Sequence, residues 1–181
     1  MSLINNLPSN YDLLSPVAFR FDVLRLPTVT FFAQSVSLPG ISLEEDTQAT
    51  PFTDIPHPGF KVSFETLEVN FLIDEDLKNY TELMNWIIGL GFPEKFEQYK
   101  DLKNQTDATK GISAKYKAEF NAVKSDATLS ILTNTKNVNK QFRFRELFPI
   151  SLSAIAFDSA GEDAPILATA SFQYTDYYLE S

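Results

Sequence analysis

The 181-residue chain contains no cysteine and a single histidine, His57. Disulfides, thiolate metal sites and cysteine nucleophiles are therefore excluded, and folding in a reducing cytoplasm is the simpler interpretation. One histidine without cysteine also rules out the usual zinc ligand sets. Only a metal held mainly by carboxylates would remain open.

Glycine and positive charge are also scarce. The chain has 6 glycines, and none lies in a phosphate-binding arrangement. Asp and Glu number 24 against 15 Lys and Arg, which gives a net charge of −9. An acidic chain repels phosphate backbones, so a role in gripping nucleic acid is disfavoured. Solubility alone would explain the same charge equally well.

No hydrophobic run is long enough to cross a membrane. The most apolar stretch, "LMNWIIGLGF", is far shorter than a bilayer span. The first residues, "MSLINNLPSNYDLL", lack the basic start and apolar block of a signal peptide. We therefore expect a soluble protein without membrane insertion.

Aromatic residues are plentiful, with 16 Phe and 7 Tyr, and this favours a β-rich fold. Alternating patterns predict strands in two early runs, 17–26 and 28–38, joined as a hairpin across Leu26-Pro27-Thr28. Further strands are predicted at 61–73, 126–133, 140–147, 150–157 and 166–179. The fold class expected is mainly β, an antiparallel two-sheet sandwich or small barrel in one domain over 1–181.

One segment is too polar for that core. After the Pro39-Gly40 turn, residues 41–60 are rich in polar residues and contain Pro51, Pro56 and Pro58, which cannot occupy a central strand. We predict a long hairpin over 41–73 whose distal half, the arm at 41–60, protrudes. Residues 1–16 are predicted to form a second, N-terminal arm.

One flanking helix is predicted between 77 and 88, on an apolar stripe of Leu77, Tyr80, Leu83 or Met84, Ile87 and Ile88. Asp74 or Asp76 would cap it, and Gly89 or Gly91 would end it before Pro93. Residues 94–124 are predicted to be a surface insertion with a partial helix and a mobile centre at 104–111.

No residue set supports catalysis. His57 lies between two prolines without a nucleophile motif, and the acidic cluster at 74–76 lacks the alternation and glycine of a Ca²⁺ loop. The acidic loop "DSAGEDAP" fails the same test. We therefore expect no enzyme activity and no cofactor.

Two later strands carry polar faces. Arg143 and Arg145 alternate with Phe142 and Phe144, which places the Phe rings in the core and the Arg side chains outside. Such Arg residues could bind single-stranded nucleic acid, or acidic residues of a neighbouring subunit. In the last strand, Ala168, Ala170, Phe172 and Tyr174 share the core face, opposite a polar and almost uncharged one.

In order along the chain, several motifs resemble the tail tube proteins of contractile-tailed bacteriophages. They are "FRFDVLRL", "SVSLPGISL", "FETLEVNFLIDEDLKNYTELMNWI", "LFPISLSAIAFD" and "ATASFQYTDYYLE". The third, a strand ending in an acidic "DED" before a helix with Tyr80 and Trp86, is the most specific. The resemblance covers most of 17–181 outside 94–124.

The resemblance implies a fold related to the haemolysin-coregulated protein of type VI secretion. It also implies hexameric rings, closed by joining inner sheets into one barrel and stacked as a tube in the virion tail. Such a tail assembles in the host bacterial cytoplasm with sheath and baseplate proteins, encloses the tape measure protein, and lets DNA pass without specific binding.

Within that picture the arm would pack on a neighbouring subunit or ring. Acidic side chains would line part of the lumen, and the insertion at 94–124 would face outward. The side chains expected at contacts between subunits or rings are those of Glu44, Glu45, Asp46, Phe52, His57, Arg143 and Arg145.

Three alternatives remain at this stage. One is a baseplate or tail-end ring protein of the same fold. Another is a soluble ligand-binding β-barrel whose many Phe residues line an apolar pocket. The third is a metal-assisted hydrolase built on Asp and Glu, for which no motif brings the required groups together.

Overall fold

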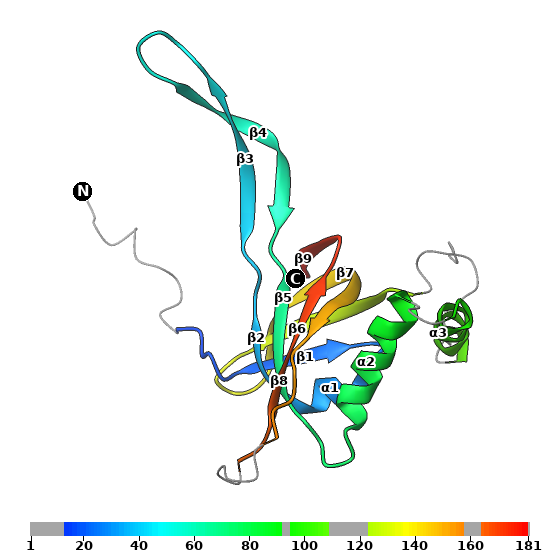
Figure 1. Ribbon diagram of the computed structural model, residues 1–181. Coiled ribbons are helices and arrows are strands. Elements are labelled where there is room, and N and C mark those ends of the chain that lie inside the picture. Colours follow the sequence, from blue (N-terminus) through cyan, green and yellow to red (C-terminus); the bar gives the residue numbers. More distant parts are fainter. Residues whose placement is uncertain (1–12, 92–94, 109–122, 158–163, 181) are drawn as a thin grey trace.

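A computed structural model describes residues 13–91, 95–108, 123–157 and 164–180. Its body is one seven-stranded antiparallel sheet that bends into two halves (Figure 1). The strand order is β1-β6-β7-β8-β5-β2, with β9 also paired to β7. The strands are β1 (Phe19–Val23), β2 (Ala33–Ser37), β5 (Leu67–Leu72), β6 (Ser125–Leu132), β7 (Val138–Leu152), β8 (Leu167–Gln173) and β9 (Asp176–Glu180).

Strand β7 belongs to both halves of the sheet. Residues 141–145 of β7 pair with β9, whereas 148–152 pair with β8. The change occurs at Glu146, whose φ of 56° lies in the left-handed region. Its backbone N–H donates to Asp126 Oδ1 at 3.1 Å instead of to a strand partner. The two predicted strands at 140–147 and 150–157 are therefore one bent strand, and residues beyond 152 leave the sheet.

The core lies between the two sheet halves and is closed by a helix. Leu67, Val69 and Phe71 of β5 and Ala168, Ala170 and Phe172 of β8 are all 0% exposed, as their alternation predicts. Helix α2 (Lys78–Gly91) inserts Trp86, which contacts the Phe172 ring at a centroid distance of 6.5 Å. The Trp86 indole N–H donates to Val123 O at 2.9 Å.

The N-terminus of α2 is capped by side chains. Asp74 Oδ1 accepts the Asn79 N–H at 3.2 Å, and Asn79 Oδ1 accepts the Tyr80 N–H at 2.8 Å. Asp76 instead forms an ion pair with Lys78. Of the two predicted caps, Asp74 is therefore the one used. The helix buries Asn79, Leu83, Trp86 and Gly89, so the predicted stripe starting at Leu77 is displaced around the helix.

The predicted hairpin between 17–26 and 28–38 is wrong. Residues 27–32 form a short helix, α1 (Pro27–Phe32), with Pro27 at its start, where a proline costs no hydrogen bond. Thr30 Oγ1 accepts the Val23 N–H at 3.0 Å, which ties α1 back to β1. Strand β1 pairs with β6 and strand β2 with β5, so the two runs lie at opposite ends of the sheet order.

The insertion contains a helix, as expected, but a longer one. Helix α3 (Glu97–Ala108) includes residues 104–108, which were predicted to be its mobile centre. Residues 109–122 lie outside the described part of the chain, as do residues 1–12 of the predicted N-terminal arm. Among the helices that the structure describes, none is long and apolar enough to span a membrane.

Candidate assembly surfaces

The most exposed part of the molecule is a two-stranded ribbon that rises from one end of the body (Figure 1). Among the residues that the structure describes, strands β3 (Ile41–Gln48) and β4 (Ile55–Phe64) pair only with each other. We call residues 41–64 the arm. A protruding hairpin is thus present, but the predicted return strand at 61–73 is two strands, because β4 ends at Phe64 and residues 67–72 form β5 in the body sheet. Pro56 and Pro58 fit within β4 because both strands of a two-stranded ribbon are edges.

Near the body the arm has one apolar face and one polar face. Ile41 pairs with Phe64 and Leu43 with Val62, which places all four side chains on one face. Ile41 is 60% and Leu43 55% exposed. On the other face, the Ser42 and Ser63 hydroxyls hydrogen-bond at 2.8 Å. An isolated ribbon of this kind buries little apolar surface and is at best marginally stable.

A bulge separates this proximal part from the distal part. Leu43 pairs with Val62, but Glu45 pairs with Pro58, so three residues of β4 face Glu44 alone. Gly59 stands in this bulge, and a Cβ there would collide with the Glu44 carbonyl. The distal part carries Asp46 opposite His57, and His57 Nε2 lies 3.3 Å from Gln48 Oε1. His57 is thus placed in the arm and has a polar partner there.

Two tyrosines fix the base of the arm to the body. Tyr177 Oη donates to Pro39 O at 2.9 Å, just before β3, and Tyr174 Oη donates to Glu65 O at 2.7 Å, just after β4. Both rings contact Phe64, at centroid distances of 5.4 and 6.1 Å. Burial raises the pKa of Tyr174 to about 12, so this hydroxyl stays protonated as a donor. Sequence patterns gave no signal for this role.

The outer face of one sheet half is polar and nearly uncharged. Leu72 and Leu167 pair at one end of this face, and the rest of it is formed by alternate polar residues of β2, β5, β7 and β8: Ser35, Ser37, Glu68, Asn70, Ser151, Thr169, Ser171 and Gln173. Hydrogen bonds cross its strands, from Asn70 Nδ2 to Ser35 Oγ at 2.8 Å and from Thr169 Oγ1 to Asn70 Oδ1 at 2.6 Å. Glu68 is the one charged group among these residues. We call this surface the polar face.

The two ends of this sheet half are open edges. In the described part of the chain, β2 pairs only with β5, and residues 148–152 of β7 pair only with β8. Unpaired edges offer backbone N–H and C=O groups to another strand, and native proteins rarely leave them bare. The polar face is therefore bounded on both sides by edges that a second copy could pair with.

Arg143 and Arg145 project from the other sheet half and bind acidic residues of their own chain. Arg145 forms a two-pronged ion pair with Asp176 of β9, with one arm, Nε to Oδ1, at 2.6 Å. This hydrogen bond raises the pKa of Arg145 and lowers that of Asp176. Arg143 lies 3.6 Å from Glu180. A contact with a neighbouring subunit stays a prediction for both, but each has a partner without it.

The remaining predicted contact residues all lie in the arm and are exposed. Glu44, Glu45 and Asp46 follow one another in β3, and Phe52 at its tip is 98% exposed. The structure thus brings five of the seven predicted residues together in the arm and places the two arginines in the body.

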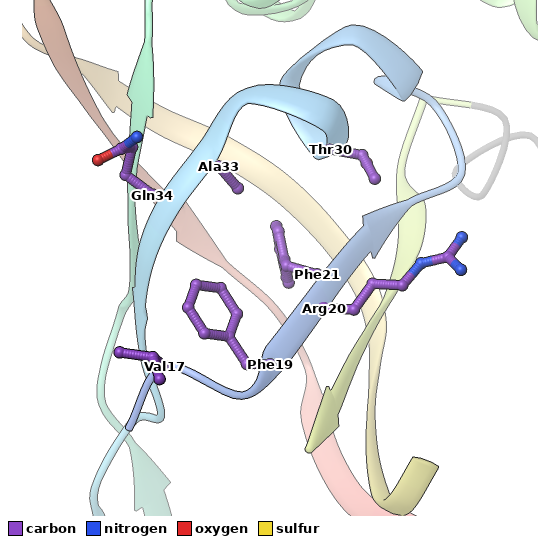
Figure 2. Close-up of a pocket in the computed structure, with 7 residues that line it drawn as sticks. All are labelled: Val17, Phe19, Arg20, Phe21, Thr30, Ala33 and Gln34. Atoms are coloured by element: carbon purple, nitrogen blue, oxygen red, sulfur yellow. The ribbon is translucent and has the colours of Figure 1, made fainter. Parts of the chain in front are cut away.

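The surface clefts do not resemble a small-molecule site. One, of about 370 Å³, separates the free edges of β1 and β2 beneath α1 (Figure 2). Val17 and Phe19 are among its lining residues (Figure 2), and Val17 is 85% exposed. The cleft is open to solvent, while the interior between the sheets is filled by core side chains. This gives no support to the ligand-binding barrel. In the described residues no group of three or more His, Asp or Glu could hold a metal ion.

Comparison with known proteins identifies the family. Residues 13–180 match the family model described as phage tail tube protein. The chain belongs to the phage tail tube protein family. This confirms the resemblance carried by the ordered motifs, and the match covers far more than half of the chain.

A curated relative is the tail tube terminator protein of Enterobacteria phage T4. It is 28% identical to this chain over 156 residues, which cover 83% of this chain and 78% of the relative. The chain is thus a structural protein of the tail tube or tube-terminator type. The family is structural and not enzymatic.

Solved structures of low sequence identity share the fold. A chain of the PVC extracellular contractile injection system, from its sheath–tube complex in the extended state, superposes with a TM-score of 0.58 at 13% identity. The superposition covers 96% of this chain and 94% of that one. A chain of the tube-terminating cap of the anti-feeding prophage gives 0.58 at 11% identity, over 100% and 99%.

Proposed function

We propose that this protein is a subunit of the phage tail tube, which closes into hexameric rings that stack into the conduit for DNA ejection. The observation that carries the proposal is the polar face bounded by two open strand edges. Pairing the β2 edge of one copy with the 148–152 edge of the next would continue the sheet from subunit to subunit. Repeating this around a ring removes every such edge.

The polar face then lines the lumen. A conduit for DNA needs a wall without fixed cations, because phosphate binding to proteins depends on Lys and Arg. The eight residues of the polar face include none, and their hydroxyl and amide groups are partly satisfied by one another. The expected acidic lining reduces to Glu68, which repeats once per subunit around the ring.

The other contacts expected of this protein concern the same assembly of rings. The arm would pack on a neighbouring subunit or ring, and the insertion at 94–124 would face outward toward the sheath. Baseplate proteins would start the tube, and the tape measure protein would fill the lumen before DNA does. Assembly would take place in the host cytoplasm before incorporation into the virion.

Electron microscopy of the purified protein over a concentration series, with light scattering alongside, tests the proposal. Hollow rings with sixfold end views, or tubes, are expected. A strictly monomeric protein at every concentration, also in the presence of baseplate proteins, would contradict it. Glu68→Lys should leave the rings intact but retain added DNA, whereas the matched Glu68→Gln should not.

A second candidate is a terminator ring at the end of the tube. The T4 relative favours it, because that protein is named a tail tube terminator. Quantitative mass spectrometry of purified tails separates the two. A tube subunit should be present at many rings per tail, and a terminator at a single ring per tail.

A further inference from the structure

The arm carries negative charge that has no partner in its own chain. The arm contains four carboxylates, Glu44, Glu45, Asp46 and Asp54, against one basic residue, Lys61, so it keeps a net negative charge. Among the described residues, none of these four carboxylates takes part in an ion pair. A cluster of unpaired carboxylates on a projecting ribbon repels itself, and a cationic partner would relieve that repulsion.

A second segment of the same chain has the opposite character. Residues 127–145 contain four basic residues and no carboxylate. Arg143 and Arg145 in this segment are already paired with Glu180 and Asp176. Lys136 and Lys140 are exposed and form no ion pair in the described part of the chain. These two lysines lie at the β6–β7 turn, which we define as residues 133–140.

Hydrogen bonds close the β6–β7 turn that carries the two lysines. Thr133 N–H donates to Asn137 O at 2.8 Å, and Lys136 N–H donates to Thr133 O at 2.8 Å. Thr133 Oγ1 also accepts the Asn137 N–H at 3.2 Å. Lys136 itself has a φ of 61°, the left-handed conformation that tight turns require. These bonds fix the backbone from which both lysine side chains project.

The two segments cannot meet within one chain. Figure 1 shows the arm rising away from the body that contains the β6–β7 turn. Strand β4 has 10 residues, so the arm projects by about 30 Å at the usual rise of a strand. This length is comparable to the width of a small domain, which lets the distal arm reach across a neighbouring copy.

We propose that the distal arm, with Glu44, Glu45 and Asp46, docks on the β6–β7 turn of a second copy, with Lys136 and Lys140 as its cationic partners. This inference rests on the proposed self-assembly and names a receiving surface for the arm. Sequence patterns indicated no such surface and offered Arg143 and Arg145 only as partners for acidic residues of a neighbouring subunit. The contact is heterologous, because different surfaces meet, so it propagates from copy to copy until a ring closes or rings stack.

Charge reversal tests the docking in the full chain. We expect Glu44→Lys/Glu45→Lys/Asp46→Lys and Lys136→Glu/Lys140→Glu each to raise the concentration for half-maximal assembly by about tenfold or more. Mixing the two variants should restore assembly. The matched controls Glu75→Lys and Lys95→Glu, at exposed positions outside the two segments, should assemble like the original protein. Unchanged assembly in both reversal variants would overturn the inference and leave the proposed function standing.

Cross-linking tests the geometry directly, since the chain has no cysteine of its own. Asp46→Cys and Lys136→Cys proteins of different tag length are mixed under assembly conditions and treated with a short bismaleimide. A heterodimer of the two tagged chains is expected, and Asp46→Cys with Lys95→Cys should give none. If rings form but Asp46→Cys and Lys136→Cys do not cross-link, the docking alone is overturned. If the chains do not associate at all, the proposed function is overturned as well.

Discussion

The arm and strand β5 lie in the same stretch of chain and have similar alternating sequences, yet they end in opposite environments. Phe71 in β5 is 0% exposed, and Phe60 in β4 is 105% exposed. In β5 every second side chain enters the core between the sheets, whereas the arm has no body surface beneath it. The difference shows that β5 is folded by the core of its own chain, whereas most of the arm finds no such core there.

The largest loss of folding stability is expected from truncation of Phe71 in β5. Phe71→Ala removes a fully buried ring and leaves a cavity, so we expect the free energy of unfolding to fall by about 3–5 kcal/mol. Chemical denaturation followed by circular dichroism measures this. A loss below about 1 kcal/mol would show that the body is not held by the core described above.

The base of the arm, where the two regions join, should give an intermediate effect. Tyr174→Phe keeps the ring contacts with Phe64 and Phe144 but removes the bond to Glu65 O. We expect a loss of about 1 kcal/mol. Tyr177→Phe, which removes the bond to Pro39 O, serves as the matched variant. If neither changes stability or the assembly concentration, the tyrosines do not set the position of the arm.

Acid should weaken the sheet half in which β9 pairs with β7. The pKa of Asp176 is lowered by its hydrogen bond with Arg145, and that of Glu146 by its hydrogen bond with Lys124. A lowered folded-state pKa gives a contribution that is present above the unfolded value, about 4, and is lost as pH falls through the folded values. Because both side chains are partly exposed, 30% for Asp176 and 37% for Glu146, solvent screens the interactions and the effect is small.

A pH series of thermal melts checks this expectation. Stability should be level from neutral pH down to about 5 and should decline below about 4. The Asp176→Asn variant should show a shallower decline, because one of the two carboxyl groups is gone. A variant with an equal or steeper decline would exclude Asp176 as a source of the acid sensitivity.

The smallest effect on folding should come from the arm. Phe60→Ala removes a ring that contacts solvent, so the unfolding free energy should change by no more than about 0.5 kcal/mol. The same change should raise the concentration needed for assembly, because the ring is free to pack on another copy. A variant that assembles normally would place Phe60 outside every interface.

Sequence patterns predicted the body well wherever alternation alone decides. They placed the buried face of β8, because its side chains alternate strictly between apolar and polar, and they placed the protruding arm, because its prolines exclude a central strand. They failed at residues 26–28, where a hairpin turn was predicted. Pro27 instead begins helix α1, and Thr30 of this helix accepts a hydrogen bond from β1. Local pattern also cannot show which strands pair, so the bend of β7 at Glu146 was missed.

The candidate site was predicted only in outline. The arm was recognised because it could not be buried, and its five exposed residues are where the pattern placed them. The ion pairs that engage Arg143 and Arg145 depend on β9 folding beside β7, a contact between distant segments. The polar face likewise exists only once β2, β5, β7 and β8 lie side by side, so no single strand revealed it.

The most direct test of the central claim is hydrogen–deuterium exchange of the arm and body amides, measured in the free subunit and in assembled rings. If the arm is completed by another copy, its amides should exchange rapidly in the free subunit and become strongly protected in rings, while those of β5 and β8 are protected in both. Arm amides that exchange equally fast in rings and in the free subunit would contradict the account.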